Sequence, residues 1–180
     1  MKLFDKDFKE IFFSQLVSIF GGLIAGTFLA IYTDKLLLIP GMLILIPGFL
    51  EMRGNISGTF ASRISSGLFL GVVKPKYRET RLVKGNMWAA TLLGIIVSAF
   101  LGLIAFTFTY FTMGVLAPKI ILLPVIAALL TDFIEIPLTW FATIWLFRKG
   151  HDPNNIMGPF LTSTGDVSSV IGLLVAMVIL

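Results

Sequence analysis

Cysteine is absent from this chain of 180 residues, and histidine occurs once, as His151. The absence of cysteine excludes disulfides, thiolate metal sites and thiol redox centres. A metal site built from several histidines is excluded as well, and a Ser-His-Asp triad would depend on His151 alone. The sequence therefore gives no obvious site for soft metals, which favour sulfur and nitrogen ligands.

Charged residues are also scarce, because Asp, Glu, Lys and Arg together make up 13% of the chain. Soluble domains carry roughly 25% of these residues, about twice as many. Hydrophobic residues make up 57% and recur in long runs along the whole sequence. These runs predict an all-α integral membrane protein, with residues 1–180 forming a single transmembrane domain in the cell membrane. The first run lacks a signal-peptide cleavage pattern, so we expect it to remain as a helix.

Turn and charge signals divide the chain into five apolar segments, which cover residues 8–32, 36–73, 85–113, 118–147 and 153–180. As one helix the second segment would measure about 57 Å, whereas the hydrocarbon core of a bilayer is about 30 Å thick. We therefore expect this segment to tilt, protrude or break. Pro40, Pro47 and the polar residues 51–55 mark the points where it can break.

Basic residues cluster at three borders of these segments: Lys2, Lys6 and Lys9; Lys74, Lys76, Arg78, Arg81 and Lys84; and Arg148 and Lys149. The opposite borders hold only Lys35 and Lys119. A single crossing by the second segment places all three clusters on one side, as the positive-inside rule requires. We predict five transmembrane helices with the N-terminus inside and the C-terminus outside, so that Arg78 is cytoplasmic and Lys119 external. The net charge of +4 then reflects membrane borders rather than binding of nucleic acid.

Polar residues fall near the midpoints of three of the segments. Gly54-Asn55 lies at the middle of the second, Asp132 near the middle of the fourth and Asp166 near the middle of the fifth. These midpoints follow from the loop assignments alone, so their common depth indicates a shared site. A charged side chain at the bilayer centre costs roughly 2.5–3.5 kcal/mol, and it is retained where it faces a cavity, a partner or an ion. Asp166 is the centre of the predicted site.

Small residues recur every fourth position along the second segment, at Gly54, Gly58, Ser62 and Ser66. Such a face is typical of a tight helix-packing seam, and it also suits the wall of a water-filled path. Both interpretations remain open from the residues alone. Carboxylate, amide and backbone carbonyl oxygens are the ligands of hard cations, and magnesium usually keeps several of its waters. A wide, weakly polar path beside an aspartate would suit the hydrated magnesium ion.

Two long motifs carry a family resemblance. The stretch 47–63, PGFLEMRGNISGTFASR, resembles the second segment of the MgtE-type magnesium channel and transporter domain, in particular of its archaeal and eukaryotic solute-carrier branch. The stretch 151–166, HDPNNIMGPFLTSTGD, is similar to the final segment of the same branch, and the fourth segment is similar around Asp132 and Pro137. Arg53 departs from the bacterial pattern, which has a glycine there.

The resemblance implies a five-span homodimer in the lipid membrane, with a central pore on the two-fold axis. The second and fifth segments of both subunits would line this pore, through which Mg²⁺ and other divalent cations are transported. The residues expected to face the metal are Asp166, Asn55 and Asp132. The expected pore-lining residues are Gly54, Gly58, Ser62, Gly158, Thr162, Ser163 and Glu135. With about ten residues before the first segment, we expect neither the cytosolic acidic domain nor the CBS pair of bacterial members.

Three alternatives to a simple transport path follow from the same residues. An ion-coupled exchanger remains open, although no clear second ion site is visible. An intramembrane aspartyl protease would pair Asp132 with Asp166, but Ser163 stands where such enzymes have the first glycine of Gly-x-Gly-Asp. A non-transporting scaffold would retain its function after loss of the Asp166 charge. We predict a transporter that is not an enzyme.

Overall fold

The chain is all-helical over residues 5–77 and 80–180, which are the residues described by a computed structural model. Lys2 and Arg78, two of the basic residues used to predict orientation, lie outside these ranges. The helices are α1 (Lys6–Ile31), α2 (Thr33–Leu36), α3 (Met42–Phe69), α4 (Arg81–Met113), α5 (Lys119–Arg148) and α6 (Pro153–Ile179). Their bounds agree closely with four of the five predicted segments. The second segment begins at the last residue of α2, and most of it forms α3.

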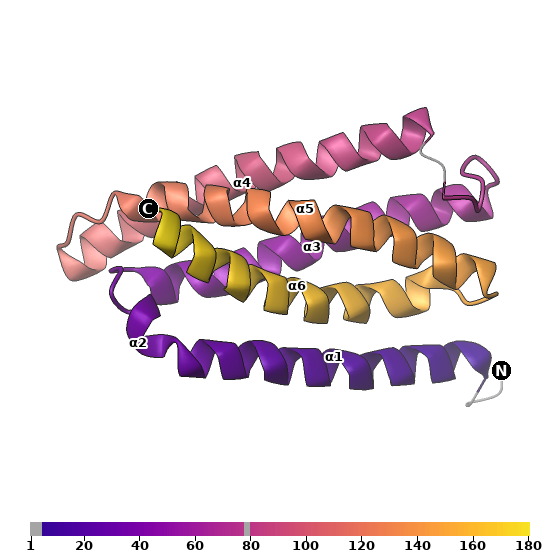
Figure 1. Cartoon of the computed structure of the whole chain (residues 1–180), viewed down its shortest axis with the longest axis horizontal. Helices are drawn as coiled ribbons and strands as arrows, with labels where there is room; N and C mark the ends of the chain where they lie inside the picture. The colour runs from indigo at the N-terminus through magenta and orange to yellow at the C-terminus, as the bar shows by residue number, and fades with distance from the viewer. Residues whose placement is uncertain (1–4, 78–79) are drawn as a thin grey trace.

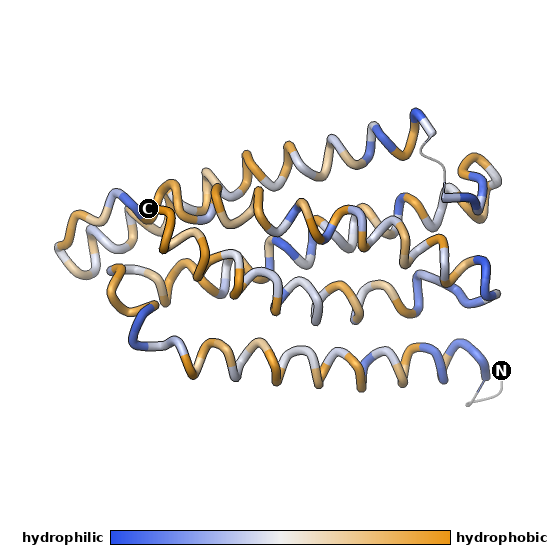
Figure 2. Tube along the Cα trace, viewed as in Figure 1, coloured by the Kyte–Doolittle hydropathy of each residue, from blue (hydrophilic) through white to orange (hydrophobic). Residues whose placement is uncertain are grey.

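The long helices lie side by side along one axis and alternate in direction (Figure 1). The N-terminal end of α1, the α3–α4 connection and the α5–α6 connection gather at one end of the bundle, and the C-terminus lies at the other (Figure 1). Hydrophilic residues mark the former end, as Figure 2 shows. The arrangement therefore collects the described members of all three basic clusters at one end, as a single crossing by the second segment requires.

Four of these helices, α1, α4, α5 and α6, are long and apolar enough to cross a membrane. Helix α3 is of comparable length, with 28 residues, but it carries Glu51, Arg53 and Arg63. These charges and the small polar residues around them lower its hydropathy. The difference between α3 and its neighbours lies in composition rather than in length.

The predicted break in the second segment occurs at Pro40-Gly41, between α2 and α3. Gly41 adopts φ 85°, a left-handed conformation that only glycine adopts readily, and it lies directly against the side chain of Thr109 on α4. Beyond this turn α3 continues without interruption through Pro47 and residues 51–55, over about 42 Å. No break occurs at these two points, which the sequence marked as possible ones: Pro47 lies inside the helix and is exposed, whereas Ile46 and Phe49 beside it are buried.

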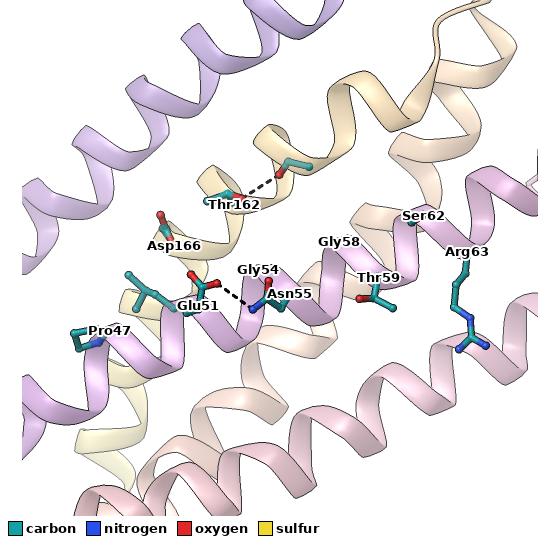
Figure 3. Close-up of a pocket in the computed structure, with 12 residues that line it drawn as sticks. Pro47, Glu51, Gly54, Asn55, Gly58, Thr59, Ser62, Arg63, Thr162 and Asp166 are labelled. Carbon is teal, nitrogen blue, oxygen red and sulfur yellow. Dashed lines mark hydrogen bonds between the residues drawn. The ribbon is translucent and has the colours of Figure 1, made fainter.

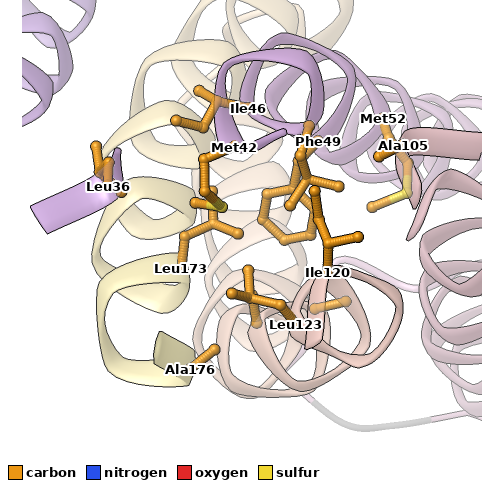
Figure 4. Packing of buried hydrophobic residues seen from close by; sticks show 13 residues of the cluster. Leu36, Met42, Ile46, Phe49, Met52, Ala105, Ile120, Leu123, Leu173 and Ala176 are labelled. Carbon is orange, nitrogen blue, oxygen red and sulfur yellow. The ribbon is translucent and has the colours of Figure 1, made fainter. Parts of the chain in front are cut away.

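A hydrophobic cluster near the C-terminal end of the bundle holds α3, α4, α5 and α6 together. It is built around residues such as Phe49, Ile120 and Leu173, which are fully buried (Figure 4). Small residues let the helices approach closely, since a Cβ on Gly102 of α4 would collide with the backbone of Ile121 on α5. The core thereby fixes α3 and α6 beside each other, and α1 packs mainly along the outer side of α6.

The start of α6 is anchored to α1 by a polar cluster. Glu10 accepts hydrogen bonds from the side chain of Asn155 at 3.1 Å and lies 2.8 Å from Nδ1 of His151. Ser14 donates to the carbonyl of Asn155 at 3.1 Å, and Asp152 caps the first turn of α6 by accepting from the N–H of Asn154 at 2.8 Å. This cluster holds the N-terminal turn of α6 in place.

Candidate cation site

A groove of about 720 Å³ runs between α3 and α6. Helix α3 contributes most of its wall and α6 contributes the rest (Figure 3). The lining residues are Pro47, Leu50, Glu51, Gly54, Asn55, Gly58, Thr59, Ser62, Arg63, Gly158, Thr162 and Asp166. Most of these residues are exposed in the single chain, so the groove is open on one side.

The wall formed by α3 follows from four-residue spacing. Gly54, Gly58 and Ser62 lie one above another because residues four apart share a helix face. The absence of large side chains leaves the backbone close to the cavity. Beside this stripe, Asn55 donates a hydrogen bond of 3.0 Å from Nδ2 to Oε1 of Glu51. The amide oxygen of Asn55 accepts no hydrogen bond within the described residues and can orient water or a ligand.

The wall formed by α6 has the same spacing, with Gly158, Thr162 and Asp166 on one face. Thr162 satisfies its hydroxyl within the helix by donating to the carbonyl of Gly158 at 3.1 Å. Asp166 is half-buried, and within the described part of the chain its carboxylate accepts no hydrogen bond. Glu51 lies close enough for its charge to act on Asp166, as Figure 3 illustrates. The groove thus offers an unpaired carboxylate with a second one nearby.

The donor set of the groove consists of two carboxylates, one side-chain amide and several hydroxyls, all of them oxygen ligands of the kind that hard divalent cations take. Over residues 5–77 and 80–180, no group of three acidic or histidine side chains is arranged to hold a metal ion. One chain is therefore too poor in ligands to strip a cation of its waters. Its groove can hold a cation through the hydration shell.

Asp132 does not reach the groove. Its carboxylate is buried on the opposite side of α3, where Oδ1 lies 2.5 Å from Nη1 of Arg53. The expectation that Asp132 stands beside Asp166 as a ligand is corrected by this geometry, because its charge is already matched by a buried guanidinium. Arg53, which the sequence left without a role, is its partner.

Glu135 is also buried away from the groove and is completely inaccessible to solvent. Its carboxylate accepts hydrogen bonds from Ser57 of α3 at 3.0 Å and from Ser168 of α6 at 2.8 Å. It therefore contacts both helices that form the groove, but from behind. The prediction that Glu135 lines the pore does not agree with this position.

Ser163 faces α1 rather than the groove. It packs directly against Gly21 and donates a hydrogen bond of 2.9 Å to the carbonyl of Phe160. Successive residues of an α-helix are rotated by about 100° around its axis. Because Thr162 faces the groove, Ser163 points toward a different side of α6. The prediction placed two neighbouring residues in one wall, and only Thr162 lies there.

Glu51, Thr59 and Arg63 line the groove although the sequence analysis gave them no site role. A signal for Glu51 was available, because it precedes Asn55 by four residues and so shares its face. The midpoints of α3 and α5 meet through Arg53 and Asp132, and Gly54 lies opposite Thr162, one turn before Asp166, so these residues share one level of the bundle. Their common depth in a membrane stays a prediction.

No solved structure matches this chain. A family model described as MgtE, divalent cation transporter, matches residues 46–176, which extend from the first turns of α3 to the last turn of α6. The match contains both walls of the groove and the buried residues behind it, although it does not separate the branches of the family. The chain therefore belongs to the MgtE family of divalent cation transporters and is a multi-pass membrane protein.

Proposed function

We propose that two copies of the chain form a pore that transports Mg²⁺, lined by α3 and α6 of each copy. The observation that carries this proposal is the carboxylate of Asp166, which has no hydrogen-bond partner among the described residues and lies in an open groove lined mostly by small or polar side chains. A carboxylate at membrane depth is costly unless it faces water or a counter-ion. Here the counter-ion is the transported cation.

A second copy supplies what the single groove lacks. Because the groove is open on one side, a two-fold axis along the membrane normal can bring two such grooves face to face at equal depth. The combined pore would then present two Asp166 and two Glu51 carboxylates to the ion. Each groove also contains Arg63, so its two carboxylates and one guanidinium give a formal charge of −1. Two grooves together carry −2, which matches a divalent cation.

Magnesium agrees best with the chemistry of the lining. The groove has neither sulfur nor imidazole, and its hydroxyls, amide and glycine backbone can accept or donate hydrogen bonds to coordinated water. Magnesium dehydrates reluctantly, so a groove that is wide enough to bind the ion through its coordinated waters favours Mg²⁺ over ions that shed their waters more easily. In this proposal α3 also crosses the membrane, which gives five spans in total. The end rich in basic residues faces the cytoplasm.

Uptake of Mg²⁺ into proteoliposomes tests the proposal. Asp166→Asn keeps the shape and one oxygen but removes the charge, so we expect flux to fall about ten- to hundredfold. This range corresponds to the roughly 1.5–3 kcal/mol of a hydrogen bond to a charged group. Asp34→Asn, at an exposed position in α2, is the matched control and should retain wild-type flux. Wild-type flux in Asp166→Asn would contradict the proposal, and dependence on an imposed sodium or proton gradient would show coupled exchange.

A further inference from the structure

Helix α3 carries polar residues on two opposite sides, and they alternate in a regular way. Gly54 and Gly58 face the groove, whereas the residues just before them, Arg53 and Ser57, are buried against α5. The two buried residues are one helical turn apart. Whatever fixes their contacts therefore also fixes the direction in which the groove wall faces.

Helix α5 meets these two residues with two carboxylates that are also about one turn apart. Arg53 is paired with Asp132 at 2.5 Å, and Ser57 donates to Glu135 at 3.0 Å. Two such contacts, one turn apart, define both the rotation and the height of α3 relative to α5. A single contact would leave α3 free to pivot.

Helix α6 joins the same network through Glu135. The second oxygen of this carboxylate accepts from Ser168 at 2.8 Å, two residues beyond Asp166. The oxygens of Glu135 also lie next to Gly165, since a Cβ placed there would be 3.4 Å from Oε2. One buried carboxylate thus touches both walls of the groove from behind, at the turn that carries Asp166.

Stability alone does not account for this network. Buried ion pairs are frequently no more stabilising than apolar side chains of similar volume, because both charges lose their hydration. Arg53 is fully buried, and its Nε and Nη2 as well as Oδ2 of Asp132 have no partner within the described residues. What charged and hydrogen-bonded contacts supply over apolar ones is direction, since they hold only in one register.

Helix α4 leaves room for the pair at Gly94. A Cβ at this position would lie 2.7 Å from Oδ2 of Asp132 and 3.5 Å from Nη1 of Arg53. Helix α4 contributes no residue to the groove lining. The pair can therefore be disturbed by one methyl group from a helix that does not touch the groove.

We propose that Arg53, Asp132 and Glu135 form a positioning network, which sets the rotation of α3 and α6 and thereby the affinity of the groove for its cation. The inference rests on the proposed transport of Mg²⁺ through this groove. None of the three residues contacts the ion in this scheme, and they act through Gly54, Gly58 and Asp166.

The first test replaces the ion pair by apolar residues of similar volume, in the double variant Arg53→Met/Asp132→Leu. We expect a folded protein whose half-saturating Mg²⁺ concentration rises about two- to thirtyfold, the range of energetic coupling reported for residues that do not touch a ligand. The measurements are Mg²⁺ uptake by proteoliposomes over a concentration series and thermal unfolding of the same preparation. Unchanged half-saturation in a folded double variant would overturn the proposal.

The second test uses three glycine variants on α4 and does not depend on the double variant folding. Gly94→Ala presses on the ion pair and should raise half-saturation. Gly102→Ala disturbs α4–α5 packing at the backbone of Ile121, and should lower thermal stability with unchanged half-saturation. Gly85→Ala meets no atom within 4 Å and should change neither.

An equal rise in half-saturation for Gly94→Ala and Gly102→Ala would overturn the positioning role, because general packing would then explain both. A wild-type protein that transports no Mg²⁺ would overturn the proposed function, and with it this inference. Normal Mg²⁺ transport in the wild type with unaltered half-saturation in Gly94→Ala would overturn the inference alone.

Discussion

Asn55 donates a hydrogen bond of 3.0 Å to Glu51, one turn earlier on the groove-facing side of α3. The bond directs the amide N–H₂ group toward a carboxylate, and the amide oxygen accepts no hydrogen bond within the described residues. Glu51 in turn keeps one oxygen unbonded within the described residues. The two side chains form a unit that can orient coordinated water, whereas Asp166 across the groove supplies charge.

The first prediction concerns Asn55→Ala. We expect Mg²⁺ flux to fall about two- to tenfold, in line with the roughly 0.5–1.5 kcal/mol of a neutral hydrogen bond. The effect should be smaller than that of Asp166→Asn, because an amide orients water without neutralising the ion. Proteoliposome uptake at matched protein incorporation measures it. Asn154→Ala, at an exposed position at the start of α6, serves as the control. A loss of flux in Asn55→Ala as large as that in Asp166→Asn would argue against this division of roles.

The second prediction concerns the width of the groove at Gly58, where an added Cβ would meet no atom within 4 Å. Gly58→Ala should therefore fold normally and retain most of its flux. Gly58→Leu should also fold, but its side chain would fill the groove and reduce Mg²⁺ flux severely. Gly22→Leu on α1 has equally open surroundings and lies outside the groove, so its flux should match the wild type. Full transport in Gly58→Leu would show that cations pass elsewhere.

The third prediction concerns the turn that starts α3. Gly41→Ala should lower the free energy of unfolding by more than 1 kcal/mol, since a non-glycine residue with positive φ costs about 1–3 kcal/mol and its Cβ would also collide with Thr109. Gly71→Ala has a similar φ of 72° but open surroundings, so it measures the strain without the collision. Thermal unfolding in detergent compares the two variants. Equal stability of both would show that α4 yields at this contact.

The sequence was informative about the lengths of the helices and the spacing of residues along them, and much less about which side of a helix each residue occupies. Hydrophobic runs and loop charges located the long helices closely, because both follow from the thickness and electrostatics of a bilayer. Four-residue spacing placed Gly54, Gly58 and Ser62 on one wall correctly. The same depth argument grouped Asp132 with Asp166, yet depth does not say on which side of a helix a residue lies.

The pairing of Asp132 with Arg53 shows why the side of a helix on which each residue lies could not be predicted. Arg53 and Gly54 are neighbours in sequence, but the former is buried against α5 and the latter lines the groove. Which of the two faces inward depends on the contacts of three helices at once. Similarly, the turn at Gly41 lies against Thr109 of α4, a contact between residues far apart in the sequence, whereas α3 continues unbroken through Pro47.

The last prediction concerns the second copy of the chain. The chain has no cysteine, so a single introduced cysteine is unique, and Thr162→Cys places it on the exposed, groove-facing side of α6. If two grooves face each other across a two-fold axis, this residue approaches its own copy, and mild oxidation in membranes should give disulfide-linked dimers. Ser163→Cys is the matched control, because the adjacent position is buried against α1 of its own chain and should remain monomeric on a non-reducing gel. Efficient cross-linking at position 163 without any at position 162 would place the dimer contact on the α1 side, and the α3–α6 groove would then face lipid instead of a shared pore.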